Sequence, residues 1–423
     1  KEGVEKALLK RLKEGDFNLD EIITLDDQRK SFLTKVEQLK AERNKNSKIP
    51  IKSWTPDGKP IGAKPTPEII KKMKEVGKEI KSLDDIIKKT EADLRAQLER
   101  LPNIPADDVP VGEDEKANVV LKKVGKIPKF NFTPKDHLGI GEELNILDVE
   151  RAAKLSGSRF GYFKREAALI EFALIQFIFE KAVRAGFIPI VPPVLVKPEI
   201  MKGMGYIDTP EDLAERYFLE KDELFLVGSS EQSIGGLHSG ETFEENELPS
   251  RVISFSTCFR KEAGSYGKDT RGVLRVHQFD KVELFSFCHP EKSKEEHKFL
   301  VDFEEKLWQS LKIPYQVVQL STGDMSRPSA STLDIEAWLP GQNMYREVSS
   351  ASNTTDFQAR RLNIRYKTKS GKPEFLHMLN ATGFPIGRTI IAILENYQQK
   401  DRSVKVPKVL QKYTGFKVIK AKK

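Results

Sequence analysis

Cysteine is nearly absent from this sequence of 423 residues, which contains only Cys258 and Cys288. Two thiols cannot build the disulfide framework of a small secreted domain, and their spacing does not match a zinc site. We therefore expect no zinc, and a reducing compartment such as the cytoplasm. Because the first residue is Lys1 rather than methionine, a targeting segment can precede it, and an organelle stays open as a location.

Long apolar runs are also lacking, since none approaches the roughly 20 residues that span a bilayer. The chain does not begin with a signal peptide, and we expect no membrane association. Lysine and arginine together number 71 against 63 acidic residues, which leaves a net charge of +8. This surplus is compatible with a polyanionic partner but does not require one.

Apolar residues follow a three-four spacing over residues 22–47 and again over 68–101. This is the periodicity of a coiled coil. The segment 47–67 between the two runs is rich in proline, glycine and lysine, and predicts an irregular tip. Two helices joined in this way fold back antiparallel, and a helix of about 34 residues reaches about 50 Å. Residues 1–104 are therefore predicted to form a helical arm.

Many cations lie along the two predicted arm helices. For any single lysine, a solvated helix face and a contact with a nucleic-acid backbone remain equally open interpretations. Taken as a set on a long arm, the charges favour nucleic acid. The candidate contact residues are Arg29, Lys35, Lys40, Arg43, Lys74 and Lys78.

The proline-bearing segment from Leu101 to Glu115 cannot be helical and predicts a domain boundary near residue 105. Beyond it, one apolar helix is predicted over 166–185. Strand-like runs follow without strand-helix alternation at 223–227, 252–260, 274–287, 315–321, 332–338 and 344–350. This pattern favours an α+β fold, with a large antiparallel sheet flanked by helices over 105–423. For the basic tail, 417–423, we expect disorder, with nonspecific RNA affinity as the alternative.

A long hairpin is predicted where Val252–Phe259 and Leu274–Phe287 flank a charged loop with three glycines. Because strand side chains alternate in direction, one face of the second strand carries Arg275, His277, Phe279, Lys281 and Glu283. A solvated edge would tolerate these charges but does not explain the phenylalanine. We interpret the face as the floor of a site for a long, charged, partly aromatic ligand, with forked donors from Arg260, Arg271 and Arg275.

Near the end of the chain, Gly383 and Gly387 are predicted to release a strand into an apolar helix. Arg388 then lies in the first helical turn. Backbone donors, the helix dipole and a guanidinium converge there, which suits phosphate oxygens. A glycine-loosened turn before a core helix is the alternative interpretation.

Together these features resemble the three motifs of class II aminoacyl-tRNA synthetases and, within that class, the seryl-tRNA synthetases. The resemblance covers nearly all of residues 1–400. Its most specific motifs are Arg260-Lys-Glu-Ala-Gly-Ser, Lys268-Asp-Thr-Arg-Gly, Val276-His-Gln-Phe, Ser352-Asn with Asp356-Phe-Gln-Ala-Arg-Arg, and Leu394-Glu-Asn-Tyr-Gln.

The resemblance implies a ligase that activates L-serine with ATP to seryl-adenylate and passes serine to the 3′ end of tRNA(Ser). A paralogue that forms an aminoacyl-adenylate for a non-tRNA acceptor is the alternative. Attack of a carboxylate on the α-phosphorus needs positioning and charge neutralisation rather than a protein nucleophile.

The resemblance also assigns site residues. It implies three catalytic arginines, Arg260, Arg275 and Arg388. The implied ATP-binding residues are Arg260, Lys261, Glu262, Val276, His277, Gln278, Phe279, Glu347, Val348, Ser349, Ser350 and Arg388. Serine is assigned to Ser229, Ser230, Glu231, Arg260, Glu283, Asn380 and Thr382. Glu347 and Ser350 are the implied ligands of Mg²⁺, which suits such hard oxygens.

The partners implied by the family are tRNA(Ser), bound through its long variable arm by the cations of the helical arm, and a second copy of the chain. Recognition of this RNA would rest on shape and backbone. The prolines at 189, 192 and 193 would sit at a symmetric dimer interface. The sequence departs from the commoner family form at Ser229 and at Ala381–Thr382, both in the implied serine pocket.

Overall fold

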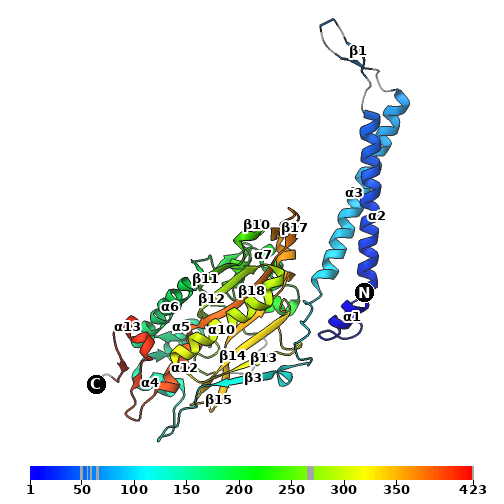
Figure 1. Cartoon of the computed structure of the whole chain (residues 1–423). Helices are drawn as coiled ribbons and strands as arrows, with labels where there is room; N and C mark the ends of the chain where they lie inside the picture. The colour runs from blue at the N-terminus through cyan, green and yellow to red at the C-terminus, as the bar shows by residue number, and fades with distance from the viewer. Residues whose placement is uncertain (48–50, 55, 58–59, 63–65, 264–270, 422–423) are drawn as a thin grey trace. The chain divides into compact units, whose positions relative to one another are not determined.

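The structure is a computed structural model that describes residues 1–47, 51–54, 56–57, 60–62, 66–263 and 271–421. The chain divides into two compact units, Lys1–Leu101 and Pro102–Lys423. Each has a core of its own, so each is described by itself (Figure 1).

The first unit contains a short helix, α1 (Glu2–Leu8), and two long helices, α2 (Leu19–Ser47) and α3 (Pro67–Glu99). The long helices run antiparallel (Figure 1), and their apolar residues meet in a buried seam. Buried members of this seam are Val36, Val76, Ile80, Leu83 and Ile87. The predicted antiparallel coiled coil is confirmed.

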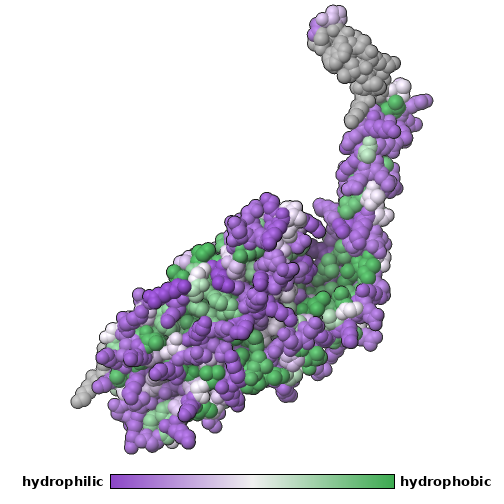
Figure 2. All heavy atoms as spheres, viewed as in Figure 1, coloured by the Kyte–Doolittle hydropathy of each residue, from purple (hydrophilic) through white to green (hydrophobic). Residues whose placement is uncertain are grey.

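Local sequence explains where α3 begins. The Thr66 side chain accepts a hydrogen bond from the Ile69 N–H at 3.3 Å, and Pro67 occupies the first turn, where its missing N–H costs nothing. The side of the arm seen in Figure 2 is mostly hydrophilic. Ion pairs link the two helices across the seam, with Lys35 Nζ 2.7 Å from Glu79 and Lys72 Nζ 2.6 Å from Glu42.

The prediction of an irregular tip is wrong for part of the segment between the arm helices. Two short strands, β1 (Ile51–Trp54) and β2 (Pro60–Gly62), pair antiparallel there. The sequence between them contains Pro-Asp-Gly, which favours a tight turn and so brings the strands together. Residues 48–50, 55, 58–59 and 63–65 of this segment lie outside the described residues.

The second unit is built around an eight-stranded sheet with the order β3-β13-β14-β15-β18-β12-β11-β6. Its strands are β3 (Val119–Val124), β13 (Tyr315–Gln319), β14 (Ser331–Leu339), β15 (Met344–Asn353), β18 (His377–Pro385), β12 (Gln278–Cys288), β11 (Ser250–Phe259) and β6 (Ile188–Ile190). Every pairing in it is antiparallel except that of β11 with β6. The predicted large antiparallel sheet is thus confirmed, and the proline-bearing strand lies at its edge, where a missing N–H is tolerated.

Successive side chains of β12 point alternately to the two faces of the sheet. Val282 and Leu284 belong to the main core, which also contains residues of α6 (Glu166–Arg184), α10 (Ser293–Leu311) and α12 (Ile386–Tyr397). On the other face, Phe285 and Phe287 join a second apolar cluster, and Lys281 and Glu283 line open hollows. One face of the sheet is therefore covered by long helices, and the other carries the site.

Shorter elements complete the second unit. The helices are α4 (His137–Leu144), α5 (Val149–Ser156), α7 (Pro198–Met204), α8 (Pro210–Ala214), α9 (Glu231–Gly235), α11 (Phe357–Leu362) and α13 (Gln411–Thr414). The strands are β4 (Leu147–Asp148), β5 (Tyr162–Phe163), β7 (Leu195–Val196), β8 (Phe218–Leu219), β9 (Leu224–Leu226), β10 (Thr242–Glu244), β16 (Arg365–Lys367), β17 (Pro373–Phe375), β19 (Val404–Lys405) and β20 (Val418–Ile419). In the described parts of the chain, no helix is long and apolar enough to cross a membrane.

The basic tail departs from the expectation of disorder. Val418 and Ile419 form β20, which pairs antiparallel with β19, and the Ile419 side chain is completely buried. An apolar residue in this position anchors the tail because its burial outweighs the surrounding lysine charge. Residues 422–423 lie outside the described residues.

The second strand of the predicted hairpin begins later than expected, at Gln278 instead of Leu274. His277 still accepts a hydrogen bond from the Arg260 N–H, but its own N–H donates to the Arg159 carbonyl oxygen and not to the hairpin. Gly272 has a φ of +82°, and a Cβ there would lie 2.4 Å from His137 Nε2. The chain can therefore pack closely against α4 only with glycine at this position. Residues 264–270 of the loop lie outside the described residues.

Candidate active site

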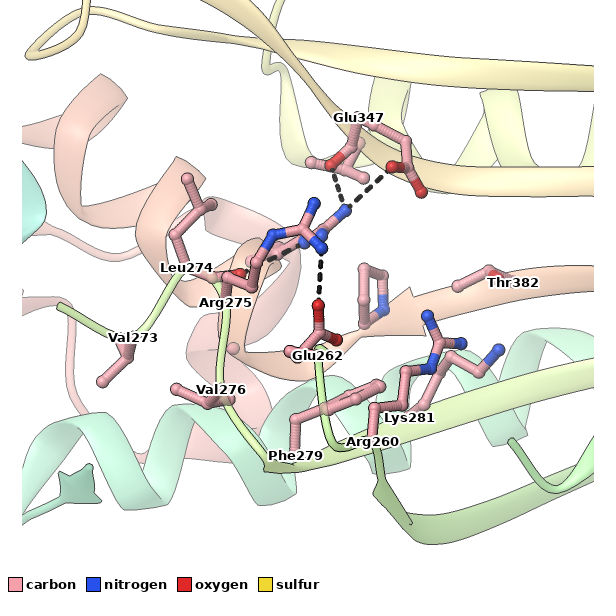
Figure 3. Close-up of a pocket in the computed structure, with 14 residues that line it drawn as sticks. Arg260, Glu262, Val273, Leu274, Arg275, Val276, Phe279, Lys281, Glu347 and Thr382 are labelled. Atoms are coloured by element: carbon pink, nitrogen blue, oxygen red, sulfur yellow. Dashed lines mark hydrogen bonds and ion pairs between the residues drawn. The ribbon is translucent and has the colours of Figure 1, made fainter. Parts of the chain in front are cut away.

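Two adjoining hollows open on the face of the sheet opposite α6, α10 and α12. The smaller is here called the arginine pocket because Arg260, Arg275 and Arg388 line it, and Figure 3 shows Arg260 and Arg275 in it. The larger is called the acidic pocket because its lining includes Glu231, Glu283, Asp324, Asp334 and Glu347. The two pockets share Arg260, Glu262, Arg275, Lys281, Glu347 and Thr382. They form one continuous site with a cationic half and an acidic half.

In the arginine pocket, two guanidinium groups are held in place by oxygen acceptors. Arg275 Nη1 lies 2.5 Å from Glu262 Oε2 (Figure 3). Arg388, in the first turn of α12, donates to the Glu347 carbonyl oxygen at 2.8 Å and to the Leu274 carbonyl oxygen at 3.4 Å. These bonds fix the two guanidinium planes beside the pocket, and fixed forked cations suit an anionic ligand.

Arg260 stands where the two pockets meet. Its Nε donates to the Gly228 carbonyl oxygen at 3.1 Å, and its guanidinium carbon lies 5.3 Å from the centre of the Phe279 ring. The backbone at this point is tied across the hairpin, since Arg260 N–H donates to the His277 carbonyl oxygen at 2.9 Å. A cation with a fixed stem and a neighbouring aromatic face can serve ligands in both pockets.

Glu231 is the most completely held carboxylate of the acidic pocket. Tyr206 Oη donates to its Oε2 at 2.7 Å, while Asn380 Nδ2 at 3.1 Å and Gln358 Nε2 at 3.2 Å donate to its Oε1. Ser229 Oγ accepts from the Glu231 N–H at 3.2 Å, at the start of α9. Such a network fixes the carboxylate before any ligand arrives.

Glu283 is a second carboxylate of this pocket, and it is 1% exposed. It forms an ion pair with Lys281, its neighbour on the same strand face. Burial raises the pKa of Glu283 to about 7, although Lys281 opposes the shift. The group therefore changes charge near neutral pH, and a ligand cation would favour its ionised form.

Oxygen donors suited to a hard metal ion gather at β14 and β15. The Arg388 guanidinium, whose Nη1 is 3.3 Å from Glu347 Oε2, lowers the pKa of Glu347 and keeps that carboxylate ionised. Burial and the Glu347 charge raise the pKa of Asp334, while Ser350 hydrogen-bonds to it. Asp334 Oδ1 is buried without a hydrogen-bond partner in the described parts of the chain. These oxygens fit a divalent ion.

Comparison with known proteins shows the family to which the chain belongs. The chain matches the model of the seryl-tRNA synthetase N-terminal domain over residues 1–105, and that of the class II tRNA synthetase core domain (G, H, P, S and T) over 217–397. It is 43% identical over 419 residues to a serine–tRNA ligase of Dictyoglomus thermophilum, covering 99% of this chain and 96% of that protein. The chain belongs to the seryl-tRNA synthetase family.

Two solved structures of the family are similar to this chain over 96% of its length. The seryl-tRNA synthetase of Pyrococcus horikoshii complexed with ATP is similar with a TM-score of 0.85 and 38% identity, covering 96% of this chain and 93% of that one. The cytoplasmic serine–tRNA ligase of Naegleria fowleri in complex with AMP has a TM-score of 0.82 and 32% identity, covering 96% and 92%.

Most of the residues that the sequence assigned through this family line the joined pockets. In the arginine pocket these are Arg260, Glu262, Arg275, Val276, Phe279, Glu347, Val348 and Arg388. In the acidic pocket they are Ser229, Glu231, Arg260, Glu283, Ser350, Asn380 and Thr382.

The other assigned residues line neither pocket. Ser230 Oγ accepts from Ser254 Oγ at 2.7 Å, and Ser349 Oγ accepts from Trp308 Nε1 at 3.1 Å, so both hydroxyls point into the protein interior. His277 Nδ1 lies 3.0 Å from the Arg260 carbonyl oxygen, where it supports the hairpin. Lys261 lies over the Tyr217 ring at 5.6 Å. Gln278 lines a third hollow beside α5 and α6, which adjoins the arginine pocket at Val276 and Phe279.

Several pocket residues were not found from the sequence. Tyr206 and Gln358 hold Glu231, and Asp334 and Arg216 line the acidic pocket. Gln358 lies in one of the motifs that identify the family, which gave a signal that it matters but not what it contacts. The other three stand in stretches whose pattern matches ordinary surface or strand sequence, so the sequence carried no signal for them.

Proposed function

We propose that this protein is a serine–tRNA ligase, which joins L-serine to tRNA with cleavage of ATP to AMP and pyrophosphate. The observation that carries the proposal is Arg260, placed where a pocket of arginines meets a pocket of carboxylates. A triphosphate needs the first environment and an amino-acid ammonium group needs the second. The two substrates of adenylate formation therefore meet at one guanidinium.

ATP occupies the arginine pocket in this proposal. Phe279 stacks on the adenine ring, and Arg275 and Arg388 bind the outer phosphates. Since Glu262 already pairs with Arg275 at 2.5 Å, the phosphates replace Glu262 as the partner of Arg275. Glu262 is then released to accept a hydrogen bond from the adenine amino group.

The first step is in-line attack of a serine carboxylate oxygen on the α-phosphorus. A new phosphorus–oxygen bond forms as the bond to the β-phosphate oxygen breaks, and pyrophosphate leaves with the electron pair. Arg260 touches both the carboxylate and the α-phosphate, so it lowers their mutual repulsion and stabilises the charge that builds on phosphorus. In the second step a hydroxyl of the terminal tRNA adenosine attacks the carbonyl carbon and displaces AMP.

Serine is bound in the acidic pocket. Glu231 and Glu283 accept from its ammonium and hydroxyl groups, and Asn380 and Thr382 complete the wall. A site that pairs a hydroxyl rejects alanine because its buried acceptors would be left without donors. The threonine methyl group would have to displace packed side chains.

Mg²⁺ bound to the nucleotide fits the oxygens of Glu347 and Ser350, with Asp334 beside them. When bound, the ion supplies positive charge to the outer phosphates. Among the described residues, no group of three or more His, Cys, Asp or Glu side chains could hold a metal ion. The phosphates would therefore complete its coordination.

The arm binds tRNA(Ser), with its long variable arm as the target of the helical cations. Arg29, Lys35 and Lys40 are ion-paired with Asp26, Glu79 and Asp84 at 2.7, 2.7 and 3.9 Å. The pairs of Lys35 and Lys40 are exposed and contribute little to stability, so a phosphate can replace the carboxylate there at low cost. The pair of Arg29 with Asp26 is half-buried. Lys74 and Lys78 are exposed. A paralogue with a non-tRNA acceptor is not favoured, because serine–tRNA ligases match the full chain, arm included.

The proposal includes a homodimer in the cytoplasm. Apolar residues stand exposed on α6 and in the proline-bearing segment that follows it, among them Leu169, Phe172, Ile188 and Val191. A second copy of the same surface would cover them. Both cysteines are free and buried, which suits a reducing compartment.

The test is exchange of labelled pyrophosphate into ATP. We expect exchange that requires serine and is absent with threonine or alanine, followed by charging of tRNA that carries a long variable arm. Absence of serine-dependent exchange in the purified chain would overturn the proposal. Exchange with serine but no charging of any tRNA would restore the alternative acceptor.

A further inference from the structure

Asn103 makes an unusually complete set of hydrogen bonds for a residue in a linker. It lies two residues after Leu101, where the first compact unit ends, and its side chain is 6% exposed. Its Nδ2 donates to the carbonyl oxygens of Pro328 and Thr354, both at 2.8 Å. Its Oδ1 accepts from the Ile104 N–H at 2.9 Å. The amide therefore joins the linker to two distant segments of the second unit.

One of these segments is a strained turn directly after β15. Thr355 has a φ of +47°, a conformation that is costly for a β-branched residue. Its Oγ1 lies 3.0 Å from Asn103 Nδ2, and its N–H donates to Asn353 Oδ1 at 2.9 Å. The turn keeps its shape because two asparagine side chains hold it from either side.

The same turn reaches the acidic pocket through buried side chains. Thr354 Oγ1 lies 3.1 Å from Gln358 Oε1 and 2.8 Å from the Met378 carbonyl oxygen, and its single hydroxyl proton serves these two acceptors. Gln358 Nε2 in turn donates to Glu231 Oε1 at 3.2 Å. Thr354 is 1% exposed and Gln358 is completely buried. A continuous series of contacts thus runs from Asn103 through Thr354 and Gln358 to Glu231.

We infer that Asn103 is a positioning residue for amino-acid recognition: by holding the Thr354–Thr355 turn it orients Gln358, and through it the Glu231 carboxylate. The inference rests on the proposed function, in which Glu231 binds serine. Buried amides that satisfy carbonyl groups on separate segments are costly to remove, because the carbonyl oxygens then lose their donors. The linker is accordingly part of the serine site, although it lies outside the pocket.

Removing the Asn103 amide should weaken the binding of serine moderately and leave the binding of ATP almost unchanged. Tyr206 and Asn380 still hold Glu231 when Gln358 shifts. Loss of one hydrogen-bonded support corresponds to about a fivefold to tenfold change in an equilibrium constant. The Asn103→Ala variant should therefore raise KM for serine by about that factor in pyrophosphate exchange, while KM for ATP stays within about twofold.

Asn103→Asp is the second variant. Its carboxylate would point an oxygen at the carbonyls of Pro328 and Thr354, so it should raise KM for serine more than Asn103→Ala does. The control is Asn396→Ala, which also removes an amide that donates to two carbonyl oxygens, those of Trp338 at 2.8 Å and Ala392 at 2.9 Å. Asn396→Ala should lose about as much thermal stability as Asn103→Ala, and it should leave KM for serine unchanged.

A double-mutant cycle tests the route. Gln358→Ala should raise KM for serine, and adding Asn103→Ala to it should raise KM no further, because both remove the same support. If the increases in KM for serine of the two single variants multiply in the double variant, Asn103 does not act through Gln358, and the inference is overturned. If Asn103→Ala does not fold, Thr354→Val, which keeps the shape and removes the hydroxyl, should give the same serine-specific change.

Two failures can be told apart. No serine-dependent exchange in the unmodified chain overturns the proposed function itself. Normal exchange in the unmodified chain, together with an Asn103→Ala variant that is only less stable or that raises KM for ATP equally, overturns the inference alone.

Discussion

At the scale of single residues, the site depends on charges whose ionisation is set by their neighbours. Arg388 lies beside Glu347 and keeps it ionised, whereas burial keeps Glu283 near the point of protonation at neutral pH. The same pocket thus contains a carboxylate fixed in charge and another that responds to its surroundings. This difference matches an ion-binding role for the first and ammonium recognition for the second.

Glu283 should give serine activation a pH dependence. Its pKa of about 7 leaves it ionised above that pH and protonated below it. Because only the ionised form attracts an ammonium group, kcat/KM for serine should fall up to about tenfold per pH unit below about pH 7. Pyrophosphate exchange measured from about pH 5.5 to 8 checks this, with KM for ATP as the internal comparison. A kcat/KM for serine that does not change with pH in the unmodified chain would contradict the prediction. The Glu283→Gln variant should have a low kcat/KM for serine at every pH.

Arg388→Lys should reduce pyrophosphate exchange by about 100-fold, because an ammonium group cannot hold two backbone carbonyls and still present a fork to phosphate. The control is Arg365→Lys, at a site outside both pockets where Arg365 Nε donates to Asn363 Oδ1 at 3.0 Å. That variant should keep full exchange. Equal losses in the two variants would show that the effect comes from stability and not from phosphate binding.

Some of these residues could be found from the sequence and others could not, for a physical reason. Alternation placed Phe279, Lys281 and Glu283 correctly, because β12 is regular over that stretch. The family resemblance assigned Ser349 to ATP, but the pairing of β14 with β15 shifts register between Ile335 and Glu336, opposite this part of β15, and the Ser349 hydroxyl faces the interior. A register shift breaks the period of two, and no local pattern announces it.

At the scale of elements, the hairpin and the β12–β18 pair shape the pocket. The register of β12 with β18 passes from Val282↔Phe384 to Glu283↔Thr382, so Gly383 has no partner. The sequence predicted that Gly383 loosens the entry to a helix, but it lies within β18. Its role is close approach: a Cβ there would lie 2.3 Å from Ile178 Cδ1, on α6.

Gly383→Ala should therefore destabilise the second unit by about 1 to 3 kcal/mol, because packed side chains must move to admit the methyl group. Thermal unfolding measures the change. Gly387→Ala is the matched control, since its Cβ would find no atom nearer than 3.6 Å. If both glycines tolerate alanine equally, the close packing of β18 against α6 is not what selects glycine.

At the scale of the whole molecule, exposed apolar surface remains on the second unit when it is taken as a single copy. Phe172 is 68% exposed and Val191 is 84% exposed, although both lie beside well-packed elements. Sequence periodicity predicted the helix and the proline-bearing strand, but a pattern of apolar residues does not say whether its partner is the same chain or another. The proposal that a second copy of the chain covers this patch therefore rests on the exposure of these side chains and not on the sequence.

Phe172→Asp should convert a dimer into a chain that sediments at 48.0 kDa. A charge at this point would be buried without a partner in the paired form. Leu237→Asp, at a residue that is 46% exposed and belongs neither to α6 nor to the proline-bearing segment after it, is the control and should stay dimeric. A monomer in the unmodified chain at micromolar concentration would contradict the proposed assembly.

The position of β3 in the sheet affects how the chain is made. This strand, Val119–Val124, pairs with β13, Tyr315–Gln319, and the ribosome must add almost 200 residues between the two. At about 5 to 20 residues per second, β3 waits roughly 10 to 40 s for its partner. The arm is complete much earlier, because its two helices are neighbours in sequence and need nothing beyond Leu101. Synthesis therefore delivers a folded arm first, followed by a linker and an unpaired strand that a chaperone can occupy until the sheet closes.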